Sequence, residues 1–129
     1  MANEIHVRLR LKYNPSLANS QGFDSGLIEF FSSMTGTEFT GWSIQAAGTT
    51  EAALTVSGGI GTQGWVIAKN LDSTNNITIG YADVGTDDDA RPITILPGKT
   101  VIFYSTGGSA LYFRCSAGTP KLQFAIFEV

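Results

Sequence analysis

The sequence is poor in the residues on which many functional sites depend. It has a single cysteine, Cys115, and a single histidine, His6, and charged residues make up 15% of its 129 residues, against about 25% in typical domains. One cysteine excludes an internal disulfide and usually acts as a small buried hydrophobe. Nucleophilic catalysis needs a base beside a nucleophile, but His6 is predicted on the outward face of a strand. We therefore expect a protein that is not an enzyme and has no catalytic residues.

Long apolar runs and clusters of basic residues are missing as well. No stretch approaches the roughly 20 apolar residues of a membrane span, and the N-terminus lacks the pattern of a signal peptide. The net charge is -3 and the eight Lys and Arg residues are scattered, whereas phosphate contacts are made by clusters of such residues. We expect neither a membrane nor a nucleic acid as partner, and a protein that is made in a cytoplasm and remains soluble.

What the sequence does contain is a series of short alternating segments separated by glycine and proline. Ile5, Val7, Leu9, Leu11 and Tyr13 alternate with four polar residues, three of them basic, which predicts a strand over residues 5–13 with a basic outer face. Residues 23–34 have both helical and strand periodicity, and we predict a strand because Gly26 and a run of weak helix formers disfavour a helix. About ten such strands predict one all-β domain over residues 1–129, an antiparallel, jelly-roll-like β-sandwich. The later strands are predicted at residues 37–47, 51–57, 93–96, 100–105, 111–116 and 121–129.

Residues 64–82 form the most strongly patterned stretch. Residues 65–71 and 77–82 are rich in aromatic and β-branched side chains, and the polar run between them is typical of a turn. We predict a β-hairpin whose bulky faces point inward. The predicted core takes one or two large side chains from each of five strands: Trp65, Ile67, Ile79, Phe103, Phe113 and Phe124.

Several short motifs also suggest a family. They are Gly64-Trp65 before an apolar run, Lys69-Asn70-Leu71-Asp72, Thr74-Asn75 and Ile79-Gly80, together with Met1 to Ile5, Gly48 to Leu54 and Leu96 to Lys99. Over most of the chain these motifs resemble a small family of tailed-bacteriophage virion structural proteins. The resemblance implies a strand at residues 23–34 and a non-enzymatic capsid decoration or head-tail accessory subunit. It also implies a location in the virion and other virion proteins as partners.

Two loops could in principle bind a cofactor or a metal ion. Residues 59–64, Gly-Ile-Gly-Thr-Gln-Gly, match the dinucleotide-binding fingerprint, but the sequence that follows allows at most two helical turns, so we predict a plain inter-strand loop. Asp83, Asp87, Asp88 and Asp89 could hold calcium, although their spacing differs from the D-x-D-x-D-G pattern and a solvated acidic loop is commoner. We expect no cofactor, and whether the acidic loop binds a cation stays open.

Two predicted strands are apolar on both faces, namely residues 100–105 and 121–129. A two-layer sandwich needs only one apolar face per strand, so the second face needs a further cover. A thick three-layer monomer could supply it, but the low charge favours assembly into a homo-oligomer, of which a trimer is one closed form, or onto other virion proteins. The predicted interface residues are Tyr104, Ala125, Phe127 and Val129.

The alternative function is a carbohydrate-binding or host-recognition module. In such a sandwich an exposed Trp42, Trp65 or Tyr81 would stack on sugar rings. Trp65 begins a predicted core strand, which argues against its taking that role.

Overall fold

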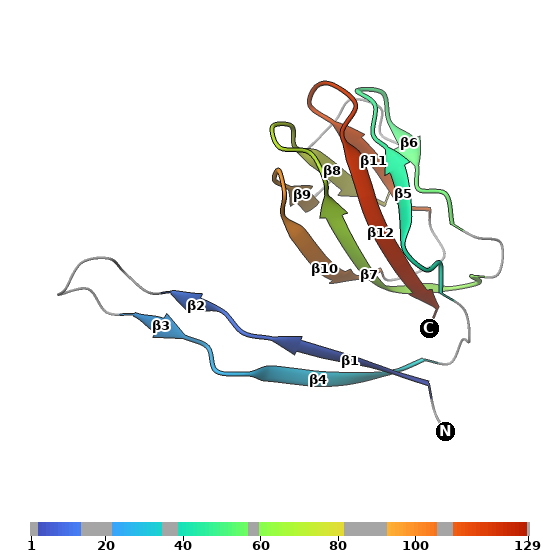
Figure 1. Cartoon of the computed structure of the whole chain (residues 1–129). Helices are drawn as coiled ribbons and strands as arrows, with labels where there is room; N and C mark the ends of the chain where they lie inside the picture. The colour runs from blue at the N-terminus through green and yellow to red at the C-terminus, as the bar shows by residue number, and fades with distance from the viewer. Residues whose placement is uncertain are drawn as a thin grey trace. The chain divides into compact units, whose positions relative to one another are not determined.

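The computed structural model of the chain describes residues 3–13, 22–34, 39–56, 60–81, 93–105 and 110–128. The chain divides into two compact units, residues 1–35 and residues 36–129, where the sequence led us to expect one domain. Every regular element in the described residues is a β-strand, and all strand pairs are antiparallel (Figure 1). The predicted all-β class is confirmed.

The first unit is a two-stranded ribbon, which we call the N-terminal hairpin. Strand β1 (Asn3–Leu9) pairs with β4 (Ile28–Met34) along all seven residues of each, and β2 (Lys12–Tyr13) pairs with β3 (Phe23–Asp24). The two ladders are separated by an irregular segment, in which Gly26 has a φ of 68° that most side chains disfavour. The strand prediction for residues 23–34 is thus confirmed for Phe23–Asp24 and Ile28–Met34, with an interruption at residues 25–27, and the helical alternative is wrong.

The second unit is a sandwich of two four-stranded sheets. The first sheet has the order β10-β7-β12-β5, and the second has the order β6-β11-β8-β9. The first sheet consists of β5 (Ser43–Ala46), β7 (Gln63–Asn70), β10 (Thr100–Tyr104) and β12 (Lys121–Glu128). The second consists of β6 (Ala52–Ala53), β8 (Ile77–Gly80), β9 (Ile93–Ile95) and β11 (Tyr112–Cys115). This arrangement confirms the predicted β-sandwich.

The hydrophobic core lies between these two sheets. Ile79, Phe113 and Phe124 are at most 1% exposed, and Phe103 is half-buried against them. Other fully buried apolar side chains come from both sheets and from the residues beside them: Ile77, Ile95 and Cys115 from the second sheet, Val66, Ala68, Leu122 and Ile126 from the first, and Ala47 and Leu111 next to strands. Four of the six predicted core positions therefore pack at the core.

The other two predicted core residues, Trp65 and Ile67, are on the opposite face of β7. Val66 and Ala68 point inward and are 0% exposed, whereas Trp65 and Ile67 are half-buried on the outer side. Ala68 is directly opposite Phe124 in the register, and side chains opposite each other on one face of a sheet are about 5 Å apart. A small residue at position 68 leaves room for the phenylalanine, so the prediction that the bulkier face points inward was wrong.

The predicted hairpin at residues 64–82 is also wrong. Strand β7 pairs with β10 and β12, whereas β8 pairs with β9 and β11, so residues 71–76 cross from one sheet to the other. The buried side chain of Asn70 holds this crossing. Its amide nitrogen donates to the carbonyls of Asn75 (2.8 Å) and Ile95 (3.0 Å), and its Oδ1 accepts from the backbone N–H of Asp72 (2.9 Å).

A second crossing uses a turn at Pro97-Gly98. The N–H of Lys99 donates to the carbonyl of Leu96 at 3.0 Å, and Gly98 has a φ of 67°, as a type II turn requires. The turn joins β9 in the second sheet to β10 in the first. The Pro97-Gly98 turn therefore connects the two layers of the sandwich, not two strands of one sheet.

Candidate functional site

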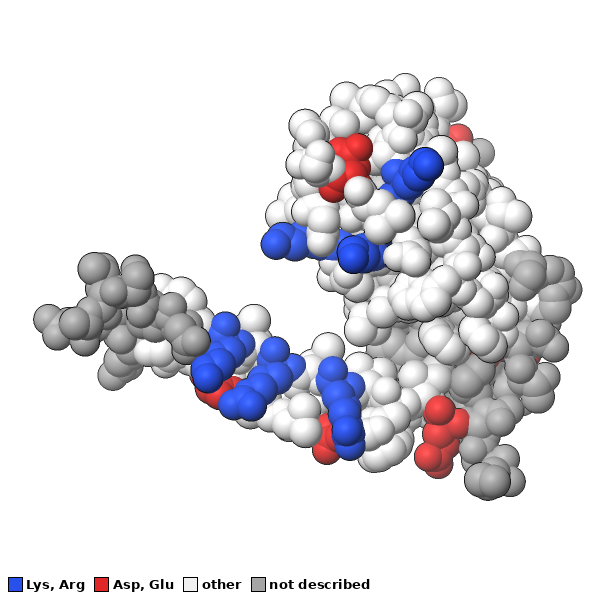
Figure 2. Space-filling model, viewed as in Figure 1, with Lys and Arg blue, Asp and Glu red and all other residues white. Residues whose placement is uncertain are grey.

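The side of the first sheet that faces away from the core is apolar. Strand alternation turns Trp65 and Ile67 of β7 and Ile102 and Tyr104 of β10 to this side. Strand β12 adds Ala125 and Phe127, β5 adds Ile44, and Phe39 forms a bridge with Phe127. We call this set of eight residues the outer sheet face. Figure 1 shows the first sheet in front of the second, and Figure 2 shows that much of the surface over it is uncharged.

The register brings these apolar side chains into direct contact across the strands. Ile102, Ile67 and Ala125 are opposite one another on three adjacent strands. In the neighbouring positions, the ring of Tyr104 packs edge-on against Trp65 with 5.4 Å between centroids, and Phe39 stacks on Phe127 at 5.7 Å. The apolar residues are therefore contiguous, not scattered singly.

Several of these side chains remain substantially open to solvent. Ile102 is 40% exposed, Tyr104 42%, Phe39 57% and Ile44 59%. Isolated exposed apolar residues are ordinary on a protein surface, but contiguous patches usually mark a site of interaction. The outer sheet face is thus the strongest candidate for a functional surface in the described part of the sandwich.

Three exposed lysines lie at one end of this face. Lys69 on β7 is opposite Thr100 and Gln123, Lys121 begins β12, and Lys99 precedes β10; all three lysines are exposed. On the face of the sandwich seen in Figure 2, basic side chains gather at this end, close to an acidic side chain. The surface therefore combines a basic end with a longer apolar stretch.

The predicted interface residues have different environments. Tyr104 is exposed and Phe127 half-buried, both on the outer sheet face. Ala125 also points to this side but is only 4% exposed, so it can offer a partner little area. Val129 lies outside the described residues.

Sequence reasoning missed Trp65 and Ile67, because it assigned them to the core, although it did identify β10 as apolar on both faces.

The N-terminal hairpin has an apolar face of its own. Ile5, Val7 and Leu9 of β1 alternate onto one side, and the register pairs them with Ser32, Phe30 and Ile28 of β4. Leu9 is 43% exposed and Ile28 50%. We call Ile5, Val7, Leu9, Ile28 and Phe30 the hairpin apolar face. It confirms the predicted alternation for residues 5–9, whereas the single strand predicted over residues 5–13 is interrupted after Leu9 and resumes at β2.

The other side of the hairpin carries cross-strand charge pairs. Arg8 forms an ion pair with Glu29, and the Nε of Arg10 donates to Asp24 at 2.9 Å. The guanidinium of Arg10 and the N–H of Gly26 hold the pKa of Asp24 below its usual value. Figure 2 shows basic side chains in a row along the hairpin, with acidic ones beside them. Opposite charges thus alternate across the two strands.

His6, the only histidine, belongs to this charged side. Its Nε2 is 3.1 Å from Glu29 Oε1 and 3.3 Å from Arg8 Nε, and its ring stacks on Phe31 at 4.2 Å. These contacts fix the ring on the surface of the hairpin among charged groups. The position agrees with the predicted outward-facing histidine.

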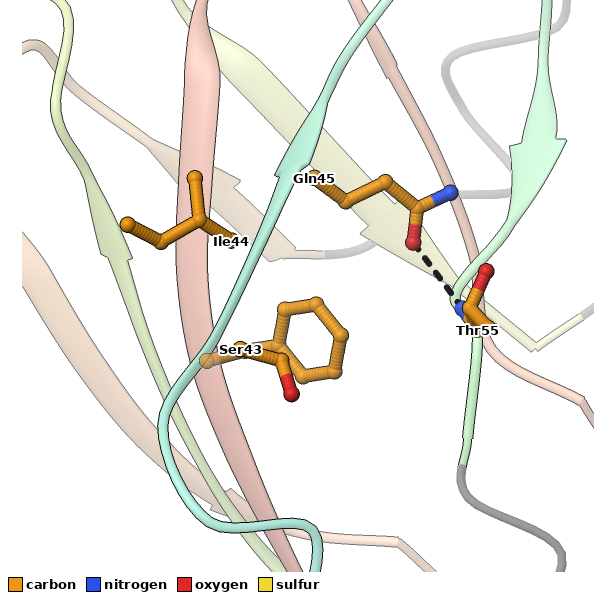
Figure 3. Close-up of a pocket in the computed structure, with 5 residues that line it drawn as sticks. Ser43, Ile44, Gln45 and Thr55 are labelled. Carbon is orange, nitrogen blue, oxygen red and sulfur yellow. Dashed lines mark hydrogen bonds between the residues drawn. The ribbon is translucent and has the colours of Figure 1, made fainter.

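A shallow pocket of about 410 Å³ opens beside the edge strand β5. It is lined by Ser43, Ile44, Gln45, Thr55 and Phe124 (Figure 3). The Gln45 side chain donates to the carbonyl of Ala53 (3.0 Å) and accepts from the N–H of Thr55 (2.9 Å), so it ties the edges of the two sheets together. None of the lining side chains is ionisable, and the Gln45 amide already forms hydrogen bonds to the backbone of Ala53 and Thr55.

The remaining sequence candidates offer no assembled site in the described residues. Gly64 of the glycine-rich motif lies within β7, so no helix N-terminus follows it. The Cys115 thiol is 1% exposed, contacts the carbonyls of Ala47 and Gly118, and has its pKa raised by burial. Asp83 and Asp87 to Asp89 lie outside the described residues. Within the described ranges there is no group of three or more potential metal ligands, and no helix there could span a membrane.

Comparisons of the chain with protein families, with curated proteins and with solved structures found no match.

Proposed function

We propose that this chain is a non-enzymatic structural protein of a tailed-phage virion. In this role it binds neighbouring virion proteins in the capsid or head-tail region as a decoration or accessory subunit. The observation that carries the assembly role is the contiguous apolar surface of the outer sheet face. The phage assignment is supported by the sequence motifs around residues 64–82 and by their resemblance to virion proteins.

The argument for assembly is energetic. Burying apolar surface contributes roughly 25 cal/mol per Å² removed from water, and soluble monomers rarely leave contiguous apolar patches larger than a few hundred Å² exposed. Ile102, Tyr104, Phe39 and Ile44 all remain at least 40% exposed on the outer sheet face. A partner that covers these side chains would remove their apolar surface from water, which favours binding at this face.

The basic end of the same face would orient a bound partner. Lys69, Lys99 and Lys121 are exposed there, and charges at the rim of an interface mainly influence partner choice and association rate. A partner that fits this surface has an apolar strip with carboxylates near one end. Binding should therefore weaken as salt is raised, because exposed charges are screened over about 10 Å at 0.1 M salt.

A carbohydrate-binding role is the second candidate, and Trp42 is the observation that favours it. Trp42 is 60% exposed, as a ring that stacks on a sugar must be. The other two aromatic candidates are engaged within the sandwich, because Trp65 packs against Tyr104 and the Tyr81 hydroxyl donates to the Tyr104 carbonyl at 3.3 Å. A single exposed ring is a weaker basis than a contiguous face.

The test compares two aspartate substitutions in the full chain. Ile102→Asp introduces a charge into the outer sheet face, whereas Leu96→Asp introduces the same charge at a residue that is 52% exposed outside that face. Copies per particle are measured by quantitative mass spectrometry of purified virions from a phage that encodes each variant. We expect at least a tenfold loss of incorporation for Ile102→Asp and normal incorporation for Leu96→Asp.

Two results would contradict the proposal. Absence of the unmodified protein from purified particles would refute the virion assignment. Binding to a glycan array that disappears in Trp42→Ala, combined with normal incorporation of Ile102→Asp, would favour the carbohydrate-binding alternative instead.

A further inference from the structure

The sandwich has two edge strands next to each other, β5 of the first sheet and β6 of the second (Figure 1). An edge strand presents backbone N–H and C=O groups that can pair with another chain, and proteins usually block such groups. The hydrogen bonds of this chain block one of the two edges and leave the other open.

The edge of β6 is blocked by the side chain of Gln45. The N–H of Leu54 donates to the carbonyl of Leu111 at 2.7 Å, and hydrogen bonds in an antiparallel pair alternate between the two sides of a strand. The carbonyl of Ala53 and the N–H of Thr55 therefore point away from β11. The Gln45 amide donates to that carbonyl at 3.0 Å and accepts from that N–H at 2.9 Å. One side chain thus makes the bonds that a further strand would make.

The edge of β5 has no such cover. The N–H of Ala47 donates to the carbonyl of Pro120 at 2.7 Å, and the register with β12 continues without a shift along β5. The same alternation directs the N–H and C=O groups of Ile44 and Ala46 away from β12. Within the described ranges no hydrogen bond reaches these groups, and both residues are exposed, Ile44 by 59%. The edge therefore offers two donors and two acceptors in the spacing of an extended backbone.

The pocket of about 410 Å³ lies directly beside this edge. Side chains of a strand alternate between its two faces, so a strand added to β5 would turn every second side chain to the inner side. There it meets the pocket lined by Ser43, Gln45, Thr55 and Phe124 (Figure 3). The intervening side chains would lie on the outer side, next to exposed Ile44. Both positions are uncharged, which favours apolar side chains in the added strand.

We propose that the β5 edge binds an extended segment of another protein as a further strand of the first sheet. The backbone of the segment bonds to Ile44 and Ala46, one of its apolar side chains fills the pocket, and the next extends the outer sheet face. In this mode of recognition, main-chain hydrogen bonds supply affinity and pockets for alternate side chains supply specificity. The pairing uses only the sandwich, so it does not depend on the virion assignment.

A second copy of β5 fits this edge less well than a segment of a different sequence. The inner side of β5 carries Ser43 and Gln45, and the Gln45 amide is already bonded to Ala53 and Thr55. Neither side chain is an apolar group that can enter the pocket of the other copy. The pocket would stay unfilled in such a dimer, whereas a segment with leucine or valine at alternate positions fills it.

The first test is amide hydrogen exchange of the unmodified chain, measured by NMR. The amides of Ile44 and Ala46 should exchange at least tenfold faster than that of Gln45, which faces Leu122 of β12. Equally slow exchange of all three amides would show that another part of this chain covers the edge, which would overturn the proposal.

The second test is binding of a synthetic peptide, followed by the amide shifts of the same residues. The probe is a capped peptide of seven alternating threonine and leucine residues with a lysine at each end, titrated to about 2 mM. Saturable shifts are expected at Ile44 and Ala46, and none with a peptide that has aspartate in place of leucine. In separate samples, the leucine peptide is N-methylated at every threonine or at every leucine. Only one of these two should bind, because a strand turns only alternate N–H groups toward its neighbour.

A pair of protein variants tests the same hydrogen bonds from the other side. Ala46→Pro removes an N–H that faces away from β12, a position where an edge strand tolerates proline, and Ala46→Val keeps that N–H. Peptide binding should weaken at least tenfold in Ala46→Pro and change less than about twofold in Ala46→Val. Circular dichroism checks that both variants fold, and the N-methylated peptides test the pairing without any change to the protein.

Several results would overturn the edge pairing. These are no shift at residues 44 and 46 up to 2 mM peptide, equal binding of the two N-methylated peptides, and undiminished binding by folded Ala46→Pro. Shifts confined to Ile102 and Tyr104 would assign the peptide to the outer sheet face alone. A dimer of the unmodified chain that is lost in Ala46→Pro, seen by sedimentation, would assign the edge to a second copy. None of these measurements concerns incorporation into particles, so this inference and the proposed function can fail separately.

Discussion

The side chain of Asn70 provides the sharpest test of how the two sheets are joined. It is 0% exposed and makes three hydrogen bonds: to the carbonyls of Asn75 and Ile95, and from the N–H of Asp72. Two of these partners belong to the segment that crosses between the sheets, and Ile95 ends β9 in the second sheet. Asn70 itself ends β7 in the first sheet, so one amide connects both layers.

The expected cost of Asn70→Ala follows from these contacts. A typical intramolecular hydrogen bond contributes about 1 kcal/mol net, and buried partners that are left unsatisfied cost more. Loss of three bonds should therefore lower the free energy of unfolding by about 3 kcal/mol, a large share of the 5–15 kcal/mol that ordinary domains possess. Chemical denaturation followed by tryptophan fluorescence measures this loss. Ser73→Ala, at an exposed position in the same crossing segment, is the control and should cost less than about 0.5 kcal/mol.

A second substitution at the same position adds a pH signature. Asn70→Asp replaces the amide donor by a carboxyl that faces two carbonyl oxygens in a buried site, so its folded-state pKa should rise above the unfolded value of about 3.9. The folded protein then binds the proton more tightly, and the stability of the variant should fall as the pH rises from about 4. A loss below about 1 kcal/mol for Asn70→Ala, or a pH-independent Asn70→Asp, would refute the assignment of the crossing to this side chain.

Two further predictions concern the core and the crossing loop. Phe113→Ala should cost about 3 to 5 kcal/mol in the same denaturant titration, because the ring is 0% exposed between the sheets; a loss below about 1 kcal/mol would contradict that placement. The backbone N–H groups of Asn75 and Thr74 lower the pKa of Asp72, so its stabilising effect is present above the unfolded pKa and is lost as the pH falls through the lower folded value. Asp72→Asn should therefore be less stable than the unmodified chain at pH 7 and converge with it in acid, and a stability difference that is constant from pH 7 to 3 would argue against this.

The sequence was informative where local patterns decide the structure. The inward face of β11 follows from strict alternation, and Phe113 is buried as predicted, together with Cys115 and the preceding Leu111. The turn at Pro97-Gly98 follows from backbone chemistry that only a few residues satisfy. The alternation of Ile5, Val7 and Leu9 likewise gave the hairpin its apolar side before any partner strand was known.

Strand pairing could not be predicted in the same way, because it depends on residues distant in the sequence. The polar run at 72–76 is compatible with a hairpin or with a crossing between sheets. What distinguishes the two is the burial of Asn70, which depends on Ile95 in a strand that follows much later. Similarly, β7 is apolar on both faces, so its period of two does not say which face is inner. The choice depends on Phe124, which packs opposite Ala68.

The same ambiguity connects the failed core prediction to the candidate function. Because Val66 and Ala68 are large enough to complete the core beside Phe124 and Ile126, Trp65 and Ile67 are not needed there. On the outer side they instead combine with Ile102 and Tyr104 into one apolar surface. Sheets that face water normally carry polar side chains on that side. Polar residues at positions 65 and 67 would leave the inward-facing side chains of β7 unchanged. The large apolar residues on the outer sheet face are therefore not required by the packing of the sandwich, and the contact with a partner that we propose would give them a physical role.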